Sequence, residues 1–154
     1  MEILVTGEKL TGKGFRAFQP AIEELIVTSH QEIHMAVYIF TPSAIQILHL
    51  LTRMAEKGIK LTLVINQIES QPAEIRTWIA ETRNRFPHAR IVDFFDLKGG
   101  HLHAKVIVGD RKKAIVGSAN FSWGGMVANY EFGVMFDDDS AWKLAAAIDD
   151  LARL

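Results

Sequence analysis

The sequence predicts one α/β domain over residues 1–154, built on a mixed, mostly parallel β-sheet flanked by helices. Three observations support this prediction. Short β-rich apolar runs alternate with segments of helical periodicity through the first half of the chain. Further apolar runs then follow one another without an intervening helical pattern. No repeat, low-complexity tract or Pro/Gly/Ser-rich linker divides the 154 residues, a length that can bury one substantial core.

The first half is expected to alternate helices and strands. Pro20 favours a first helical turn, Thr41 is a candidate N-cap, and Gly58 is a candidate residue just beyond a helix end. The nearly continuous apolar run over 32–40 is typical of a strand covered on both faces. The expected elements are helices within 18–30, 41–58 and 72–86, and strands over 32–40, 59–66 and 89–95.

The second half is expected to be richer in strands. Two strands, over 101–110 and 113–118, flank a polar turn at 109–112, and a third covers 130–136. The run 137–154 reads as a closing helix whose first residues are aspartates, which suit the positive end of a helix dipole.

The composition is that of an ordinary globular protein. Hydrophobic residues make up 49%, charged residues 23%, and the net charge is −1, so binding to nucleic acid would rest on a local basic patch. The lack of cysteine excludes disulfides, thiolate nucleophiles and cysteine-ligated zinc. No secretory signal or bilayer-spanning apolar run is visible, so we expect a cytoplasmic protein without stable membrane insertion.

The run HLHAKVIVGD (residues 101–110) carries polar chemistry into an apolar strand. Side chains alternate between the two faces of a strand, so His101, His103 and Lys105 are expected to share one face. A neutral imidazole beside a fixed ammonium suits attack on a phosphate: the ammonium binds a phosphate oxygen and stabilises developing charge, while the ring nitrogen is the nucleophile. Ser118 and Asn120 can approach the same phosphate, and Glu131 can hold the far ring nitrogen of His103.

Structural explanations compete with these roles. A histidine on an apolar strand is often a packed core or interface residue, GSANFSWGG can be a loop punctuated by glycine, and Asp110 can be an ordinary turn residue. Lys105 fits a structural explanation least, because burying an unpaired lysine is costly.

A zinc pair formed by His101 and His103 is disfavoured. Lys105 would place a positive charge on the same face, and no further cluster of His, Asp or Glu completes the ligand shell. The remaining histidines are interpreted as structural or surface residues: His30, His34, His49 and His88.

The segment from His103 to Asn120 matches the pattern H-x-K-x4-D-x6-G-S-x-N at every fixed position. By this motif the chain resembles the phospholipase D superfamily. Asn129-Tyr130-Glu131 is similar to the downstream acidic segment of that family, and the runs IHMAVYIFT and EKGIKLTLVIN are similar to its N-terminal half. The resemblance covers most of the chain.

The resemblance implies a phospholipase D-like fold and a phosphodiesterase that needs no metal or other cofactor. The motif acid, Asp110, is expected to support the scaffold of the active site rather than take part in chemistry. The other implied roles are a covalent phosphohistidine at His103, phosphoryl binding by Lys105 and Asn120, a place near the phosphate or histidine for Ser118, and orientation of an imidazole by Glu131.

One motif supplies one histidine, yet the chemistry needs two. In-line displacement puts the nucleophile and the leaving oxygen on opposite sides of phosphorus, so a general acid must lie opposite His103. Members of the family typically carry two copies of the motif. The single copy here predicts a two-fold homodimer with its active site at the interface, where the two His103 side chains face each other.

A short chain with one motif resembles the compact bacterial endonuclease branch, so the leading expectation is a nuclease that hydrolyses DNA or RNA. Trp123 and Phe121 can stack on a base or simply pack, and Gly124 and Gly125 would let their loop move. Basic residues near the motif are candidate contacts to nucleic acid, although a solvated turn explains them equally well: Lys98, Arg111, Lys112 and Lys113.

Two alternatives stay open. The same chemistry would serve a phospholipid hydrolase or a phosphatidyl transferase, although no long amphipathic or transmembrane segment favours a lipid substrate. A non-catalytic binding module would keep the fold without turnover. The intact motif argues against that alternative, because binding alone does not need a nucleophile.

Overall fold

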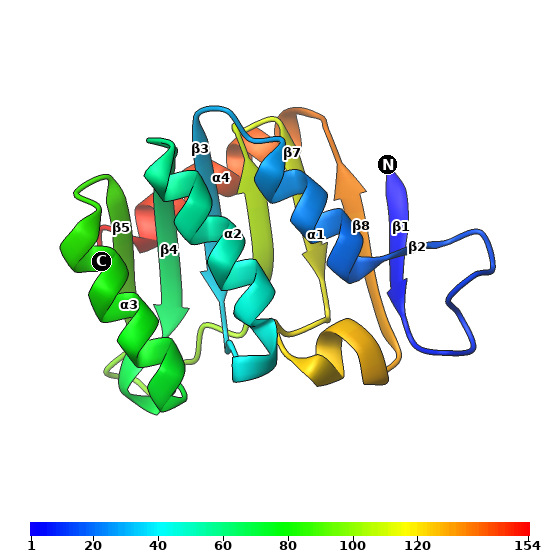
Figure 1. Cartoon of the computed structure of the whole chain (residues 1–154), viewed down its shortest axis with the longest axis horizontal. Coiled ribbons are helices and arrows are strands. Elements are labelled where there is room, and N and C mark those ends of the chain that lie inside the picture. Colours follow the sequence, from blue (N-terminus) through cyan, green and yellow to red (C-terminus); the bar gives the residue numbers. More distant parts are fainter.

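The computed structural model describes residues 1–154, which fold around one eight-stranded β-sheet (Figure 1). The strand order is β2-β1-β8-β7-β6-β3-β4-β5, and the predicted mixed α/β class is confirmed. The strands are β1 (Glu2–Thr6), β2 (Arg16–Ala17), β3 (Glu32–Val37), β4 (Lys60–Asn66), β5 (Ala89–Phe94), β6 (Lys105–Gly109), β7 (Lys113–Gly117) and β8 (Glu131–Phe136).

The sequence predicted a mostly parallel sheet, but antiparallel strand pairs outnumber parallel pairs. The pairs β1–β2, β3–β4 and β4–β5 are parallel, whereas β1–β8, β3–β6, β6–β7 and β7–β8 are antiparallel. The reason is the way the later strands are connected. A parallel pair needs a crossover that returns the chain to the same end of the sheet, and none separates β6, β7 and β8.

The helices cover the two faces of the sheet unequally. Helices α1 to α3 lie on one face, where they share a core of 33 buried residues with the strands, while α4 lies on the other over nine (Figure 1). The second face is therefore the less covered one. The helices are α1 (Phe18–Val27), α2 (Ile45–Glu56), α3 (Ala73–Arg85), α4 (Asp139–Leu151), the 3₁₀ turns η1 (Pro42–Ala44) and η2 (Ile68–Ser70), and the π-helix η3 (Gly124–Ala128).

Three differences from the predicted elements bear on the site. The strand expected from His101 begins at Lys105, because residues 101–104 have no regular structure. Thr41 does not cap a helix: its hydroxyl lies 2.7 Å from Ser43 Oγ, and a 3₁₀ turn precedes α2. Strand β1 and the π-helix η3 are not predicted at all, the latter because it falls in an expected loop.

The two ends of the sheet differ in character, and we name them after a motif residue at each. The His103 end is where β3 and β4 finish and β6 begins, and the Asp110 end is the opposite one. At the Asp110 end, β6 and β7 form a hairpin whose turn residues Asp110 and Arg111 have φ values of 52° and 56°, as a type I′ turn requires. The Asp110 carboxylate accepts three backbone N–H groups from residues 30–32, at 2.8–3.1 Å. This carboxylate ties the hairpin to the start of β3.

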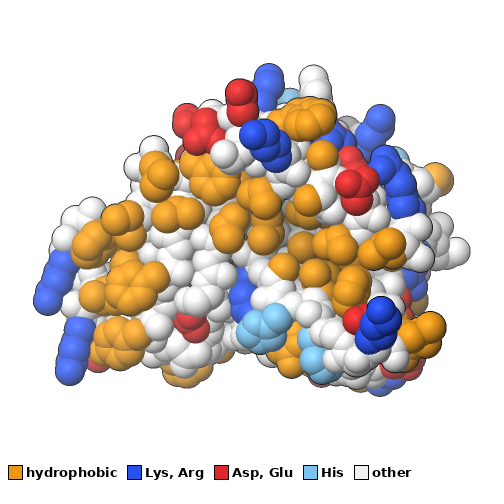
Figure 2. All heavy atoms as spheres, turned by 180° about the vertical axis from the view of Figure 1, so that it is seen from behind, with side chains coloured by type: hydrophobic (Ala, Val, Ile, Leu, Met, Phe, Trp, Pro, Cys, Tyr) orange, Lys and Arg blue, Asp and Glu red, His pale blue; other side chains and the backbone are white.

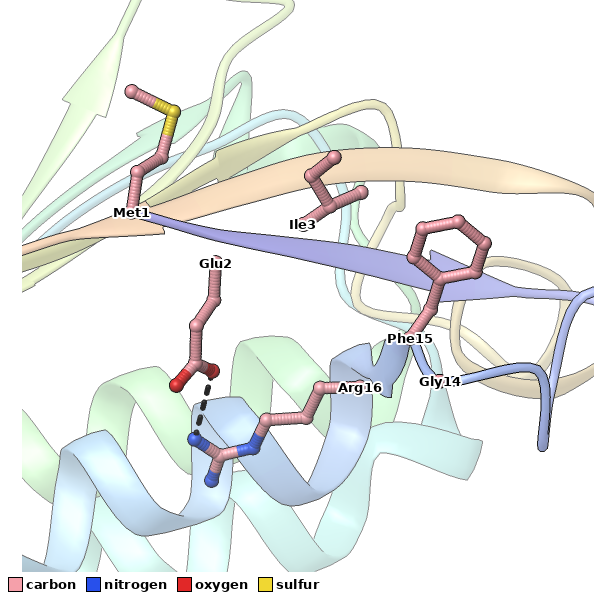
Figure 3. Close-up of a pocket in the computed structure, with 6 residues that line it drawn as sticks. All are labelled: Met1, Glu2, Ile3, Gly14, Phe15 and Arg16. Atoms are coloured by element: carbon pink, nitrogen blue, oxygen red, sulfur yellow. Dashed lines mark hydrogen bonds and ion pairs between the residues drawn. The ribbon is translucent and has the colours of Figure 1, made fainter.

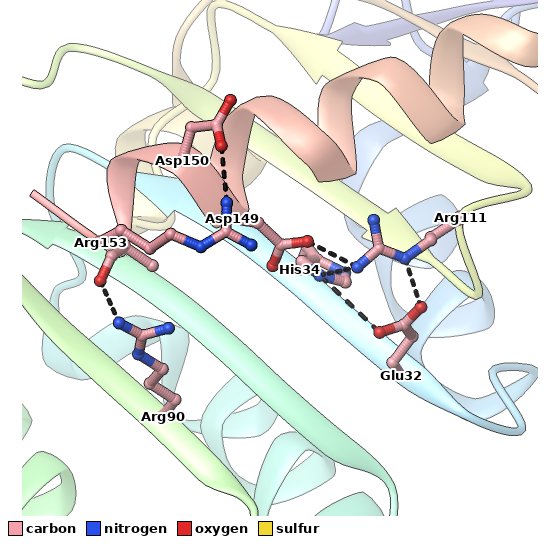
Figure 4. Close-up of polar contacts among 8 residues, drawn as sticks. Glu32, His34, Arg90, Arg111, Asp149, Asp150 and Arg153 are labelled. Carbon is pink, nitrogen blue, oxygen red and sulfur yellow. Dashed lines mark hydrogen bonds and ion pairs between the residues drawn. The ribbon is translucent and has the colours of Figure 1, made fainter.

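Arg111 extends the same anchor to α4 (Figure 4). Its guanidinium donates to Glu32 Oε1 at 2.7 Å and to Asp149 Oδ2 at 2.6 Å. His34 is 1% exposed, and its Nε2 lies 3.1 Å from Asp149 Oδ1. Burial lowers the pKa of His34. The network holds α4 across the Asp110 end of the sheet.

A continuous row of aliphatic residues crosses the α4 face. Its members pair across neighbouring strands in the order Ile3, Val134, Val116, Val106, Ala36, Val64 and Val92. Ala36 and Val64 are buried, whereas Ile3 is 51% exposed and the residues between Ile3 and Ala36 are partly exposed. Figure 2 shows apolar side chains spread over this side of the molecule. Helix α4 therefore covers only part of this row, and the part on β1, β8, β7 and β6 is left partly exposed.

Replacing Asp110 by Asn tests the anchor at the Asp110 end. The variant loses the charged acceptor of three N–H groups, so we expect the free energy of unfolding at pH 7 to fall by about 2 kcal/mol. Although burial raises the pKa of Asp110, these hydrogen bonds lower it below the ordinary value of 3.8. The contribution is therefore present above that pH and is lost as the pH falls through the folded-state pKa.

Denaturant unfolding of both proteins from about pH 5 to about pH 2 measures this contribution. The difference between wild type and variant should shrink as the pH falls. A difference that stays constant over this range would contradict the assigned role.

Candidate active site at the His103 end

His103 and Lys105 lie side by side at the start of β6. Lys105 Nζ is 2.8 Å from His103 Nδ1 and donates to the His103 carbonyl oxygen, also at 2.8 Å. Lys105 Nζ also lies 3.4 Å from His103 Nε2, so the ammonium is close to both ring nitrogens. His103 is exposed to solvent, whereas Lys105 is 9% exposed. The pair therefore presents a reachable imidazole backed by a buried cation.

The environment of Lys105 favours the binding of an anion beside its ammonium group. Burial lowers the pKa of Lys105, and the nearby Glu131 carboxylate opposes that effect. A phosphate beside the ammonium would supply the negative charge that the buried site lacks.

Glu131, the first residue of β8, is held by side chains that follow β7 and precede β8. Its carboxylate accepts hydrogen bonds from the Ser118 hydroxyl and from Asn129 Nδ2, the latter at 3.2 Å. Ser118 is itself fixed to β8, since its Oγ accepts the Phe132 N–H at 3.2 Å. The expected hydrogen bond from Glu131 to the ring of His103 is absent within the chain, where the Glu131 carboxylate binds Ser118 and Asn129 instead.

Asn120 is positioned by close backbone packing against η3. A Cβ added to Gly125 would lie 2.6 Å from Asn120 N and closer still to its carbonyl oxygen, so only glycine allows this approach. The Asn120 side-chain oxygen is buried and has no hydrogen-bond partner. The sequence interpretation of Gly125 as a source of loop motion is corrected: Gly125 is buried in the π-helix and serves packing.

Two buried amides that the sequence analysis did not single out organise the same end. Gln71 Nε2 donates to the carbonyl oxygens of Tyr38 (3.0 Å) and Asn66 (2.8 Å), and Gln71 Oε1 accepts the Phe40 N–H at 3.1 Å. Asn66 Oδ1 accepts the Leu102 N–H at 2.9 Å. For Asn66 the only sequence signal was a polar residue at the end of an apolar strand, which does not identify its distant partner. Gln71 follows a short turn and had no such signal.

The motif residue Asp110 and the basic residues after it do not join this group. Asp110, Arg111 and Lys112 lie at the opposite end of β6, roughly 15 Å away along the strand, and Lys113 begins β7 there. The expectation that Arg111 and Lys112 lie near the site is wrong, because the hairpin turn places them at the far end of the sheet. The charge of Arg111 is also paired with two carboxylates.

Of the other residues predicted to contact nucleic acid, two are exposed and one is buried. Lys98 is exposed in the loop that leads to His101, and Trp123, which follows Asn120, is 60% exposed. Phe121 is 2% exposed and packs on Phe40 with ring centroids 5.1 Å apart. Phe121 is thus a core residue and cannot stack on a base.

Five surface cavities have lining residues that do not include His103, Lys105, Ser118, Asn120 or Glu131. A cavity of about 610 Å³ lies at the β1–β2 side of the sheet, where Met1, Ile3 and Phe15 line it above the Glu2–Arg16 ion pair (Figure 3). No three His, Asp or Glu side chains come together in a way that could hold a metal ion. None of the helices combines the length and the apolar character that crossing a bilayer requires.

Comparison with protein families places the chain. Residues 22–151 match the family model described as "Cardiolipin synthase, PLD-like domain". Curated relatives include cardiolipin synthase A of Yersinia pseudotuberculosis and of Edwardsiella ictaluri, each 22% identical over 91% of the chain. The chain spans only 29% of the length of these relatives.

Solved structures share the fold. NucT from Helicobacter pylori superposes with a TM-score of 0.75 at 21% identity, covering 87% of this chain and 86% of that one. The phospholipase D family member Nuc from Salmonella typhimurium gives 0.71 at 20% identity, covering 99% and 91%. Phosphatidylserine synthase from Haemophilus influenzae gives 0.73 at 15% identity, covering 98% of this chain and 38% of that one.

Gly125→Ala tests the packing that positions Asn120. The added methyl group must push the Asn120 backbone aside, so we expect the free energy of unfolding to fall by about 1–3 kcal/mol and hydrolytic activity to fall at least about tenfold. Gly124→Ala is the matched control, because its Cβ would meet only the Asn129 side chain, at 3.2 Å. Equal behaviour of the two variants in thermal unfolding and activity assays would argue against this account.

Proposed function

Because the chain belongs to the phospholipase D superfamily, whose domain model covers residues 22–151, we propose that it is a phosphodiesterase that hydrolyses nucleic acid through a covalent phosphohistidine. The observation that carries this proposal is the exposed imidazole of His103 with the Lys105 ammonium 2.8 Å away. His34 also lies beside a cation, 3.3 Å from the Arg111 guanidinium, but that imidazole is buried and its neighbours are carboxylates.

The proposed first step forms a bond between a ring nitrogen of His103 and phosphorus while the bond to the leaving oxygen breaks. Lys105 and Asn120 bind the non-bridging oxygens, which gain negative charge in the transition state. The leaving alkoxide takes a proton from a general acid on the opposite side of phosphorus. In the second step, water attacks phosphorus, gives its proton to that same group and releases the histidine.

The general acid is proposed to be the partner subunit's His103 in a two-fold homodimer. The chain itself places no second histidine opposite His103, since His101 precedes it on the same loop. The exposed aliphatic row on the α4 face supports the second copy as the occupant of that face, because it continues through β6, the strand that follows His103. Burying such a patch is the usual source of dimer stability.

A nucleic-acid substrate is supported by two exposed residues at the His103 end. Trp123 offers a face on which a base can stack, and Lys98 offers a cation for a neighbouring phosphate. Arg111 and Lys112 lie too far away to contribute, so affinity should depend on stacking more than on a long basic track.

A phospholipid substrate is the second candidate, and one observation favours it. In the loop between β5 and β6, Phe95 is 68% exposed and Leu97 is 92% exposed, next to Lys98. Exposed apolar side chains beside a cation are suited to the surface of a bilayer. The same histidine chemistry would then act on the ester of a lipid headgroup.

His103→Asn tests the proposed nucleophile. We expect turnover to fall at least about 1,000-fold with the fold intact, because the variant lacks the imidazole that is proposed to form the covalent adduct. His49→Asn, which changes an exposed histidine on α2, should leave turnover unchanged. Full activity of His103→Asn would support the binding-module alternative instead.

Incubation in EDTA with plasmid, single-stranded DNA, RNA, and vesicles of cardiolipin or phosphatidylcholine identifies the ester. We expect hydrolysis of at least one nucleic acid, lost in His103→Asn. Hydrolysis of the lipids alone would replace the leading proposal by the second candidate.

Light scattering after size exclusion tests the homodimer, which should have twice the chain mass of 17.2 kDa. Ile3→Glu places a charge in the exposed aliphatic row and should weaken the dimer and the activity together. Val27→Glu, at an equally exposed site on α1, is the control and should do neither. A wild-type monomer with full activity at the assay concentration would contradict the proposal.

A further inference from the structure

The aromatic ring of Tyr38 lies against both His103 and Lys105. Tyr38 follows β3, and its ring centroid lies 4.4 Å from that of His103, with the planes tilted by 50°. Lys105 Nζ lies 5.4 Å from the same centroid. His101 meets the ring edge-on at 6.5 Å. One ring therefore touches the nucleophile, the cation and the neighbouring histidine.

The backbone that carries Tyr38 is fixed on both sides. The Tyr38 N–H donates to the Ala104 carbonyl at 3.0 Å, and the Tyr38 carbonyl accepts from Gln71 Nε2 at 3.0 Å. Gln71 is 5% exposed and also binds Asn66, whose side chain holds the Leu102 N–H. The ring of Tyr38 and the loop of His103 thus depend on the same pair of buried amides.

The loop that carries His103 has no regular secondary structure to hold its side chain. Within the chain, two neighbours contact the His103 ring: the Lys105 ammonium, which is close to both ring nitrogens, and the Tyr38 ring. A bound phosphate would draw the ammonium toward itself, which leaves Tyr38 as the contact that does not change. A fixed aromatic face also favours the positive charge that the imidazole gains when its nitrogen attacks phosphorus.

We propose that Tyr38 is a positioning residue whose ring sets the orientation of the His103 imidazole for attack. The catalytic part of this inference rests on the proposed function, whereas the orientation of the ring does not. Neither part involves the phenolic hydroxyl. The ring alone is assigned the role, so Phe should replace Tyr and an aliphatic side chain should not.

The test compares Tyr38→Phe with Tyr38→Leu in the full-length chain, with Tyr38→Met as a second aliphatic variant should the Leu variant unfold. NMR of the histidine rings reports orientation without substrate. We expect one ordered His103 ring in wild type and Tyr38→Phe, and an averaged ring in the aliphatic variants. In turnover, Tyr38→Phe should stay within about twofold, while the aliphatic variants should lose at least about tenfold in kcat with little change in KM.

Two results would overturn the inference. Folded aliphatic variants that keep an ordered His103 ring and wild-type kcat would show that the aromatic ring of Tyr38 is not needed. A Tyr38→Phe variant as impaired as Tyr38→Leu would assign the role to the hydroxyl. If the wild type hydrolyses none of the esters, the proposed function fails, but the NMR comparison still decides the orientation of His103.

Discussion

The site depends on one buried ammonium. Lys105 occupies a strand position where burial disfavours its charge, so the charge must be compensated locally. The His103 carbonyl, His103 Nδ1 and the nearby Glu131 carboxylate provide that compensation. Before Lys105 the chain leaves strand geometry: the His103 N–H donates to the His101 carbonyl at 3.0 Å, and the His103 carbonyl accepts from Lys105 Nζ. The imidazole of His103 is exposed on this irregular segment.

The strand that carries this chemistry is anchored at its other end. Asp110 ties the hairpin to β3, and Arg111 ties it to α4 through Asp149. The motif therefore contributes to both ends of β6. Its histidine and lysine lie together at one end, and its aspartate stabilises the hairpin at the other. Separation along β6 leaves His103 exposed at one end, while Asp110 and Arg111 anchor the hairpin at the other.

Much of the fold and part of the site could be predicted from the sequence. Apolar runs and helix-ending residues such as Gly58, whose φ of 86° is left-handed, located the central elements. The spacing of His103 and Lys105 placed both at one strand end. The turn at 109–112 was predicted, but Arg111 was expected near the site because it closely follows the motif in sequence. The length of β6 instead places Arg111 at the opposite end of the sheet from His103. Tyr38 and Gln71 could not be found, because their contacts join segments that are distant in sequence.

The central claim is that His103 becomes covalently bonded to phosphorus. Rapid mixing with excess substrate, quenching in base to preserve a phosphoramidate bond, and peptide mass spectrometry test it most directly. The account predicts a phosphoryl adduct on the peptide that contains His103, formed and lost at rates consistent with turnover. Steady turnover without any adduct on His103, or an adduct on a different residue, would contradict it.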